Sequence, residues 1–446
     1  MPFNKLGLKS FKIIKLFGVN NVELKINDDT GIFVGENGIG KTTILNVLFF
    51  TMTKKFHKLL YVDFESIELT FNSNEKMTLL KEWLETDSLY FNEEIIERIS
   101  RYLTKQDFVY FTSQLKYRPI DEVLQLSNIK RKLPPAILRD IKLIKSKKMH
   151  VENIPLIEFG LLIDKYITDE ILYFPTYRRI EEDLIKLGIN LPDNDVENKE
   201  DIELIQFGMS DVKNVFYNIE EEIKNSTILG YSQVTGEMIS HLVHMQEVTN
   251  KMKEKIKDYV TLDIVLDRVG KHLREQDRNR IRELIRSNEL FEDTRNTYNP
   301  LIFFLYNLFE IYEQHRQKDD SIKNFTKVCN SYLVNKEVEY NESTVKIMVI
   351  DKKSREPIEL SNLSSGEKQI VSLFTRILLT TQNNFILLFD EPELSLSIEW
   401  QEKLLEDVIN TGNCSFMIAV THSPFIYNNS LREYAQSMEL CISEDN

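Results

Sequence analysis

The stretch GIFVGENGIGKTTILNVL, residues 31–48, contains in direct succession the patterns of a strand, a glycine-rich loop and a helix. Residues 22–34 are typical of β-structure that ends in an apolar strand, and residues 42–50 predict the helix. The loop fits GxxxxGK[ST], in which backbone N–H groups and the lysine bind phosphates and the hydroxyl holds Mg²⁺. We therefore expect a nucleotide triphosphate to contact the consecutive residues Gly35, Glu36, Asn37, Gly38, Ile39, Gly40, Lys41, Thr42 and Thr43.

Two apolar runs near the C-terminal end finish in residues that suit the same chemistry. Residues 385–389, FILLF, predict a strand buried on both faces, and Asp390 and Glu391 follow it directly. An aspartate at such a strand end can bind Mg²⁺, and a glutamate beside it is placed to polarise the attacking water. The run CSFMIAVTHSP, residues 414–424, predicts another strand, which ends at His422. We expect His422 to hydrogen-bond the γ-phosphate.

The segment LSNLSSGEKQIVSLF, residues 360–374, predicts a helix that begins beside two serines. The four residues Ser364, Ser365, Gly366 and Glu367 combine a hydroxyl cap with a small residue where a phosphate could approach. An ordinary helix N-cap is the alternative, because such caps are common.

Four segments, GENGIGKTT, LSSGEKQ, LLFDEPE and THSP, resemble in this order the Walker A, signature, Walker B and switch-histidine motifs of ABC-type ATPases. The resemblance is closest to the branch that contains the SMC, RecF and OLD proteins. It implies an α/β fold with an ABC-type P-loop NTPase head, built from an N-terminal and a C-terminal lobe. ATP and Mg²⁺ are the cofactors that it implies.

The resemblance also implies roles for individual residues. Thr42 and Asp390 would bind the magnesium ion, Glu391 would be the catalytic base, and His422 would sense the γ-phosphate. Ser365 and Gly366, with Glu367 beside them, would contact ATP held by a second copy of the chain. A homo-oligomer with at least two heads follows from this arrangement.

The family's Q-loop glutamine has no identified counterpart in this chain. The segment ILYFPTYRRIE, residues 171–181, resembles the corresponding region of OLD-like members, with a strand followed by a polar turn. Three side chains there are candidates to replace or supplement the glutamine, namely Tyr177, Arg178 and Arg179.

The pattern predicts five parts along the chain. They are head lobe I (1–75), a helical insertion (76–150), a return to the head (151–191), a helical insertion (192–334) and head lobe II (335–446). Residues 59–71 alternate like a strand, and residues 300–312 predict a buried helix. In the second insertion, apolar residues at steps of three and four predict one helical face, at Met238, Leu242, Met245, Val248, Met252, Ile256 and Tyr259. Bundle core and a short antiparallel coiled-coil arm are both compatible with that face.

Composition and charge limit the class of protein. The chain has 446 residues and a formal net charge of −14, which opposes general attraction to nucleic acid. The window from Lys130 to Lys148 is an exception, because it is strongly basic; a solvated helix face is its alternative reading. The sequence shows no signal peptide, no membrane-spanning run and no CxxC pair, so we expect a cytoplasmic protein without a membrane partner.

The function that we expect is that of a regulatory ATPase in bacterial anti-phage defence. The segments LSSGEKQ and YFPTYRRIE resemble the ATPase subunits of PARIS systems, which hold a Toprim nuclease and release it when a phage protein is sensed. Septu- and retron-associated ATPases share these motifs. Only 24 residues follow His422, and no nuclease motif is found, so we expect no nuclease activity in this chain. The alternatives are a RecF-like repair ATPase that closes on DNA, and an assembly scaffold that binds ATP without turnover.

Overall fold

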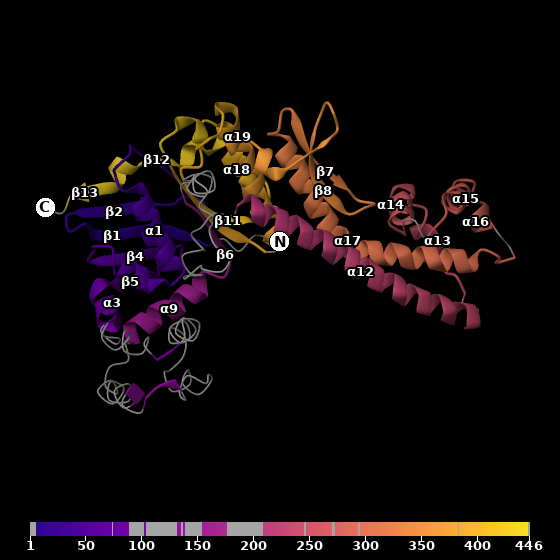
Figure 1. Ribbon diagram of the computed structural model, residues 1–446. Helices are drawn as coiled ribbons and strands as arrows, with labels where there is room; N and C mark the ends of the chain where they lie inside the picture. Colours follow the sequence, from indigo (N-terminus) through magenta and orange to yellow (C-terminus); the bar gives the residue numbers. More distant parts are fainter. Residues whose placement is uncertain are drawn as a thin grey trace. The chain divides into compact units, whose positions relative to one another are not determined.

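The computed structural model describes residues 6–73, 75–88, 102–103, 132–134, 137–138, 154–175, 208–244, 247–269, 273–292, 295–381 and 383–444 (Figure 1). The chain forms two compact units. Unit 1 contains Met1–Thr176, Phe385–Pro392 and Cys414–Asn446, and unit 2 contains Tyr177–Asn384 and Glu393–Asn413. Unit 1 therefore combines segments from both ends of the sequence.

The first sheet of unit 1 is antiparallel, with the strand order β13-β2-β1-β4-β5. Its strands are β1 (Leu8–Leu16), β2 (Asn20–Lys25), β4 (Ser66–Phe71), β5 (Lys76–Leu80) and β13 (Ile442–Glu444). Alternate side chains of β1, such as Phe11 and Ile13, are fully buried, so one face of this sheet packs into the core.

The second sheet of unit 1 has the order β12-β3-β11-β10-β6, and its pairs are parallel. Its strands are β3 (Thr30–Val34), β6 (Glu170–Phe174), β10 (Phe385–Asp390), β11 (Cys414–Thr421) and β12 (Ala435–Ser437). Every residue of β10 is buried, which confirms the strand predicted from FILLF. The helix α1 (Lys41–Met52) packs against β10 and β11 and is buried along most of its length.

Two local predictions in unit 1 need correction. The strand predicted at 59–71 is confirmed for residues 66–71, which form β4, but α2 (Phe56–Leu59) ends at Leu59 and the strand begins only at Ser66. Residues 76–80 were expected to be helical, yet they form β5, which pairs with β4 and buries Met77 and Leu79. A short apolar segment forms a strand when it can pair with the edge of a neighbouring strand. The helices α3 (Lys81–Ser88) and α9 (Ile154–Tyr166) complete the described part of this unit, together with short helical turns near its C-terminal end.

Unit 2 is built on two long helices, α12 (Met209–His244) and α17 (Asn299–Asn330), which pack against each other. A side chain on Gly230 of α12 would meet Ile311 of α17 at 2.8 Å, so the glycine permits the close approach. The helices α13 (Asn250–Lys255), α14 (Tyr259–Val269), α15 (Glu275–Arg286) and α16 (Glu289–Glu292) share an apolar core with parts of α12 and α17. The predicted helix at 300–312 is confirmed as part of α17.

The single helical face predicted from residue 238 to residue 259 was wrong. Helix α12 ends at His244, and Thr249 caps a new helix by accepting a hydrogen bond from the Met252 N–H. Leu242 and Tyr259 are exposed, whereas Ile256 is fully buried. The apolar residues therefore belong to the end of the long helix α12 and to the separate helices α13 and α14, and Met245 lies outside the described residues. No described helix is both long and apolar enough to span a membrane.

The rest of unit 2 combines a small sheet with the helices that follow it. The sheet consists of β7 (Lys336–Asn341), β8 (Lys346–Asp351) and β9 (Pro357–Ile358). A short 3₁₀ turn, η2 (Leu360–Asn362), leads to α18 (Ser365–Phe374), which continues into a π-helical turn, η3 (Thr375–Thr380). The last helix of the unit is α19 (Ile398–Ile409).

A buried ion pair joins three parts of unit 2. Arg268 of α14 donates two hydrogen bonds of 2.8 Å to the carboxylate of Asp319 on α17. The Arg268 Nε also donates to the Glu342 carbonyl oxygen at 2.8 Å, and the Tyr340 hydroxyl donates to Asp319. Asp319 is 0% exposed. Because both charges are removed from water, the attraction between them compensates for the lost hydration of each.

We predict that Asp319→Ala lowers the free energy of unfolding by about 3–5 kcal/mol, because it leaves the Arg268 guanidinium buried and uncompensated. Chemical denaturation of the purified chain measures the change. Arg316→Ala is the matched control, because Arg316 lies on the same helix and is exposed. Equal denaturation midpoints for the two variants would show that the ion pair does not hold unit 2 together.

Candidate nucleotide-binding site

The glycine-rich loop between β3 and α1 is preformed around the side chain of Lys41. Gly38 and Gly40 have φ angles of 91° and 93°, which a residue with a side chain rarely adopts. Lys41 is only 5% exposed, and its Nζ donates to the carbonyl oxygens of Gly35 at 2.7 Å and Glu36 at 2.9 Å. The loop thus holds an ammonium group at the first turn of α1, where backbone N–H groups are also available to an anion.

A hydrogen bond connects this loop to the distant acidic pair. The Thr42 hydroxyl donates to Asp390 Oδ2 at 2.8 Å, although the two residues are 348 positions apart in the sequence. Asp390 is 1% exposed at the end of β10. A hydroxyl and a carboxylate oxygen are hard ligands of the type that Mg²⁺ binds, so this pair fits a magnesium ion beside bound phosphates.

The ends of β3, β11 and β10 bring the other predicted residues to the same edge of the sheet. The Gly35 N–H donates to the Thr421 carbonyl oxygen at 3.2 Å, and the Glu391 N–H donates to the Val420 carbonyl oxygen at 2.8 Å. His422 follows Thr421 directly. Glu391 is half-buried and has a φ of 50°, a backbone conformation that costs energy for a residue with a side chain. His422 is exposed at the same edge.

Behind α1, Tyr173 of β6 fixes the helix against the sheet. Its hydroxyl donates to the Asn46 Oδ1 at 2.8 Å, and its ring stacks on Phe49 with 4.8 Å between the ring centres. Burial, together with the nearby charge of Asp390, raises the pKa of Tyr173 well above its usual range, so the hydroxyl stays protonated and donates. Sequence reasoning missed this residue, because a tyrosine within an apolar strand carries no local sign of its partner.

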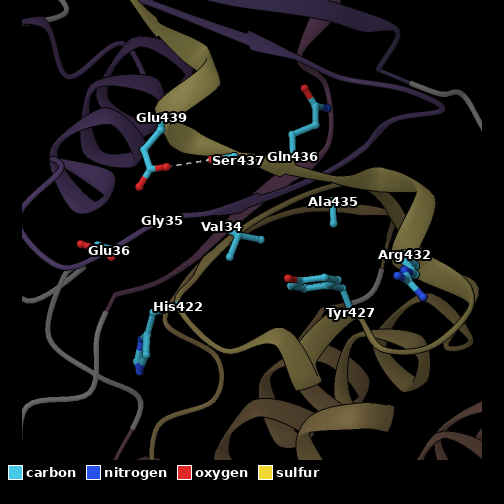
Figure 2. A pocket seen from close by; sticks show the side chains of 10 residues that line it. All are labelled: Val34, Gly35, Glu36, His422, Tyr427, Arg432, Ala435, Gln436, Ser437 and Glu439. Carbon is cyan, nitrogen blue, oxygen red and sulfur yellow. Dashed lines mark hydrogen bonds between the residues drawn. The ribbon is translucent and has the colours of Figure 1, made fainter.

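A pocket of about 490 Å³ lies beside the beginning of the loop (Figure 2). It places the first loop residues, Gly35 and Glu36, and the predicted γ-phosphate sensor, His422, in one cavity. Its lining residues are Val34, Gly35, Glu36, His422, Tyr427, Arg432, Ala435, Gln436, Ser437 and Glu439. The residues after His422 were not predicted from the sequence, because β12 has only three residues and none of them is strongly apolar.

The predicted signature residues belong to unit 2, whereas the loop belongs to unit 1. Ser364 caps α18, because its Oγ accepts from the Glu367 N–H while Glu367 accepts from the Ser364 N–H at 2.7 Å. This confirms the predicted hydroxyl cap. Burial alone would raise the pKa of Glu367, but an ion pair with Lys336 at 2.7 Å and the Ser364 hydrogen bonds outweigh it and lower the pKa. Glu367 therefore fastens the start of α18 to β7, and Ser365 remains half-buried beside it.

Gly366 has a packing role that the sequence did not reveal. A Cβ atom at this position would lie 2.5 Å from the Ser395 carbonyl oxygen and 3.2 Å from the Trp400 ring. The first contact is with backbone, which cannot move aside as a flexible side chain would. The glycine is thus required for the close approach of α18 to the segment before α19, whatever its relation to a phosphate.

Two predicted groups lie mostly or wholly outside the described residues. Tyr177, Arg178 and Arg179 are not described, so the replacement for the Q-loop glutamine stays a prediction. Of the basic window from Lys130 to Lys148, the structure describes only residues 132–134 and 137–138.

Comparison with known proteins gives one family match along most of the chain. The model of a family described as AAA ATPase domain matches residues 1–427. No curated protein matches the chain. A crystal structure of an Smc head bound to the C-winged helix domain of ScpA covers 98% of this chain and 97% of that chain, with 8% identity and a TM-score of 0.33. An Smc head with an extended coiled coil, bound to the C-terminal domain of ScpA and derived from Pyrococcus furiosus, covers 98% and 96%, with 10% identity and a TM-score of 0.34.

We predict that Gly366→Ala destabilises unit 2 by about 1–3 kcal/mol, because the added methyl group overpacks against the Ser395 backbone. Thermal unfolding followed by circular dichroism measures this change. The matched control is Gly236→Ala in α12, where a Cβ atom meets nothing within 4 Å, so helix propensity should leave that variant at least as stable as the wild type. A Gly366→Ala chain as stable as the control would contradict the packing role.

Proposed function

Because the chain belongs to the AAA ATPase domain family, we propose that it binds ATP with Mg²⁺ and hydrolyses it at the edge of the parallel sheet of unit 1. The hydrogen bond between Thr42 and Asp390 is the observation that supports this most directly. It joins the phosphate-binding loop to the acidic strand end in the arrangement that a magnesium nucleotide requires.

Each residue of the site has a separate role in the proposed binding and hydrolysis of ATP. In the structure Lys41 donates to the carbonyl oxygens of Gly35 and Glu36 and Thr42 donates to Asp390. With nucleotide bound, Lys41 would contact the β- and γ-phosphates, and Thr42 and Asp390 would hold the metal. A bound Mg²⁺ would neutralise charge on the phosphates. Glu391, half-buried and next to Asp390, orients the attacking water and accepts its proton. His422 donates a hydrogen bond to the γ-phosphate.

A second copy of the chain completes the site in this proposal. Ser365 stands at the first position of α18, where the positive end of the helix dipole favours an anion. The resemblance to ABC-type ATPases places this segment against the γ-phosphate of a partner head. ATP would then hold two heads together, and hydrolysis would let them part, so the protein functions as a homo-oligomer.

The biological role that we propose is regulation of a separate effector in anti-phage defence. The motifs resemble those of AriA, the ATPase subunit of the PARIS system, which implies a Toprim nuclease as effector and a phage protein as trigger. The net charge of −14 favours a protein partner over a nucleic acid that is coated along its length. The basic window from Lys130 to Lys148 supports the alternative, a RecF-like clamp whose hydrolysis is stimulated by duplex DNA.

We predict that Glu391→Gln retains ATP binding and loses at least about 100-fold in turnover, because the water loses its base. Steady-state phosphate release and ATP binding at equilibrium are the two measurements. Lys41→Ala is the contrasting variant, in which nucleotide binding itself should be lost. Turnover by Glu391→Gln at the wild-type rate would exclude Glu391 as the base and revive the scaffold alternative.

The proposed role predicts that tagged Glu391→Gln, purified from its native host, retains a second protein in stoichiometric amount. The variant should keep its heads closed on ATP, so the bound partner is not released. Native mass spectrometry identifies what remains attached. A nuclease at a fixed ratio agrees with the proposal, whereas nucleic acid without any protein would support the DNA clamp instead.

A further inference from the structure

Two hydrogen bonds join one face of α1 to two neighbouring strands. The first, from the Thr42 hydroxyl to Asp390 of β10 at 2.8 Å, connects the two residues that suit a metal ion. The second runs from the Tyr173 hydroxyl of β6 to Asn46 Oδ1 and also measures 2.8 Å. Because Thr42 and Asn46 are four residues apart on α1, their side chains lie one above the other on the same helix face.

The pairing of β6 with β10 places Tyr173 and Asp390 on the same face of the parallel sheet. Tyr173 lies opposite Leu388 in this pair, and Asp390 follows Leu388 by two residues. Alternate residues of a strand point to the same face, so both side chains point toward α1. Burial raises the pKa of Tyr173, and the charge of Asp390 raises it further, which agrees with their proximity. All of these residues belong to unit 1.

The ring and the hydroxyl of Tyr173 act on α1 in different ways. The ring stacks on Phe49, with 4.8 Å between the ring centres, and Phe49 is itself buried. Apolar contact of this kind is non-directional and does not by itself fix the helix at one position. A hydrogen bond restricts both distance and angle, so the bond to Asn46 determines where α1 lies along the sheet.

We propose that Tyr173 is a positioning residue for the metal ion, a role that rests on the nucleotide site proposed above. Mg²⁺ requires near-octahedral geometry with oxygen ligands at about 2.0–2.1 Å. The separation of its two protein ligands, Thr42 and Asp390, depends on the place of α1 against β10. The bond from Tyr173 to Asn46 contains no metal ligand, so it holds α1 in the same place with and without the metal.

The test measures ADP affinity by calorimetry in EDTA, with Mg²⁺ and with Ca²⁺. ADP lacks the γ-phosphate, so the proposed pairing of heads does not contribute. Tyr173→Phe keeps the ring and should weaken ADP binding with Mg²⁺ by about 10-fold, a loss typical when a residue that orients metal ligands is removed. Binding with Ca²⁺ should weaken less, because Ca²⁺ accepts longer bonds and more varied geometry. Binding in EDTA should equal that of the wild type.

Two further variants make the test specific to this bond. Asn46→Ala removes the acceptor and should reproduce the loss seen with Mg²⁺, and the double variant should be no weaker, because one interaction is removed in each case. Tyr166→Phe is the matched control. The Tyr166 ring also stacks on a phenylalanine, Phe71, and its hydroxyl donates to Glu75 beside the antiparallel sheet of unit 1. All three affinities of this control should equal those of the wild type.

Each other outcome overturns the proposal in a distinguishable way. Equal losses in EDTA, Mg²⁺ and Ca²⁺ would show that Tyr173 only supports the packing around α1. Unchanged binding with Mg²⁺ in Tyr173→Phe would show that the bond does not position the metal ligands. If Mg²⁺ did not tighten ADP binding by the wild-type chain, the metal site at Thr42 and Asp390 would itself be wrong, and the role of Tyr173 with it.

Discussion

The candidate site depends on one hydrogen bond, from the Thr42 hydroxyl to Asp390, because it joins the two ends of the sequence at the point where chemistry is expected. Neither residue is placed by its own segment alone. Thr42 is positioned by the turn from β3 into α1, and Asp390 by its burial at the end of β10. The parallel pairing of β3 with β11, and of β11 with β10, aligns the strand ends so that the contact can form.

Because the predicted site residues are divided between two units, different contacts hold them in position. Lys41, Asp390, Glu391 and His422 share unit 1, where paired strands hold their backbones in register. Ser365 and its neighbours belong to unit 2, where a capping box, an ion pair and the close contact at Gly366 fix the start of α18. The segment predicted to be the signature motif is therefore held in place by its own packing. Such a segment suits a role in which it must meet a ligand held elsewhere.

Sequence reasoning succeeded where the signal was local. The glycines before Lys41, the unbroken apolar run before Asp390 and the cap at Ser364 each specify their own conformation. It failed where distant residues decide the structure. The apolar residues from Met238 to Tyr259, spaced three or four apart, fit one helix. In the structure a new helix starts at the Thr249 cap, because the apolar core that six helices share favours separate helices there. The strand β5 and the contact of Tyr173 with Asn46 likewise depend on partners that no local pattern identifies.

The strand order of the parallel sheet has a consequence for biosynthesis. The strand β3 is made early, but its two neighbours, β11 and β12, come from the last part of the chain. At about 5–20 residues per second, the ribosome needs on the order of 20–75 s to pass from one to the other. Throughout that time the phosphate-binding loop follows a strand with no partner on either side. Of the early strands, β1, β2, β4 and β5 can pair with one another, but β3 emerges as an apolar strand with two unpaired edges, which is the kind of surface that chaperones bind.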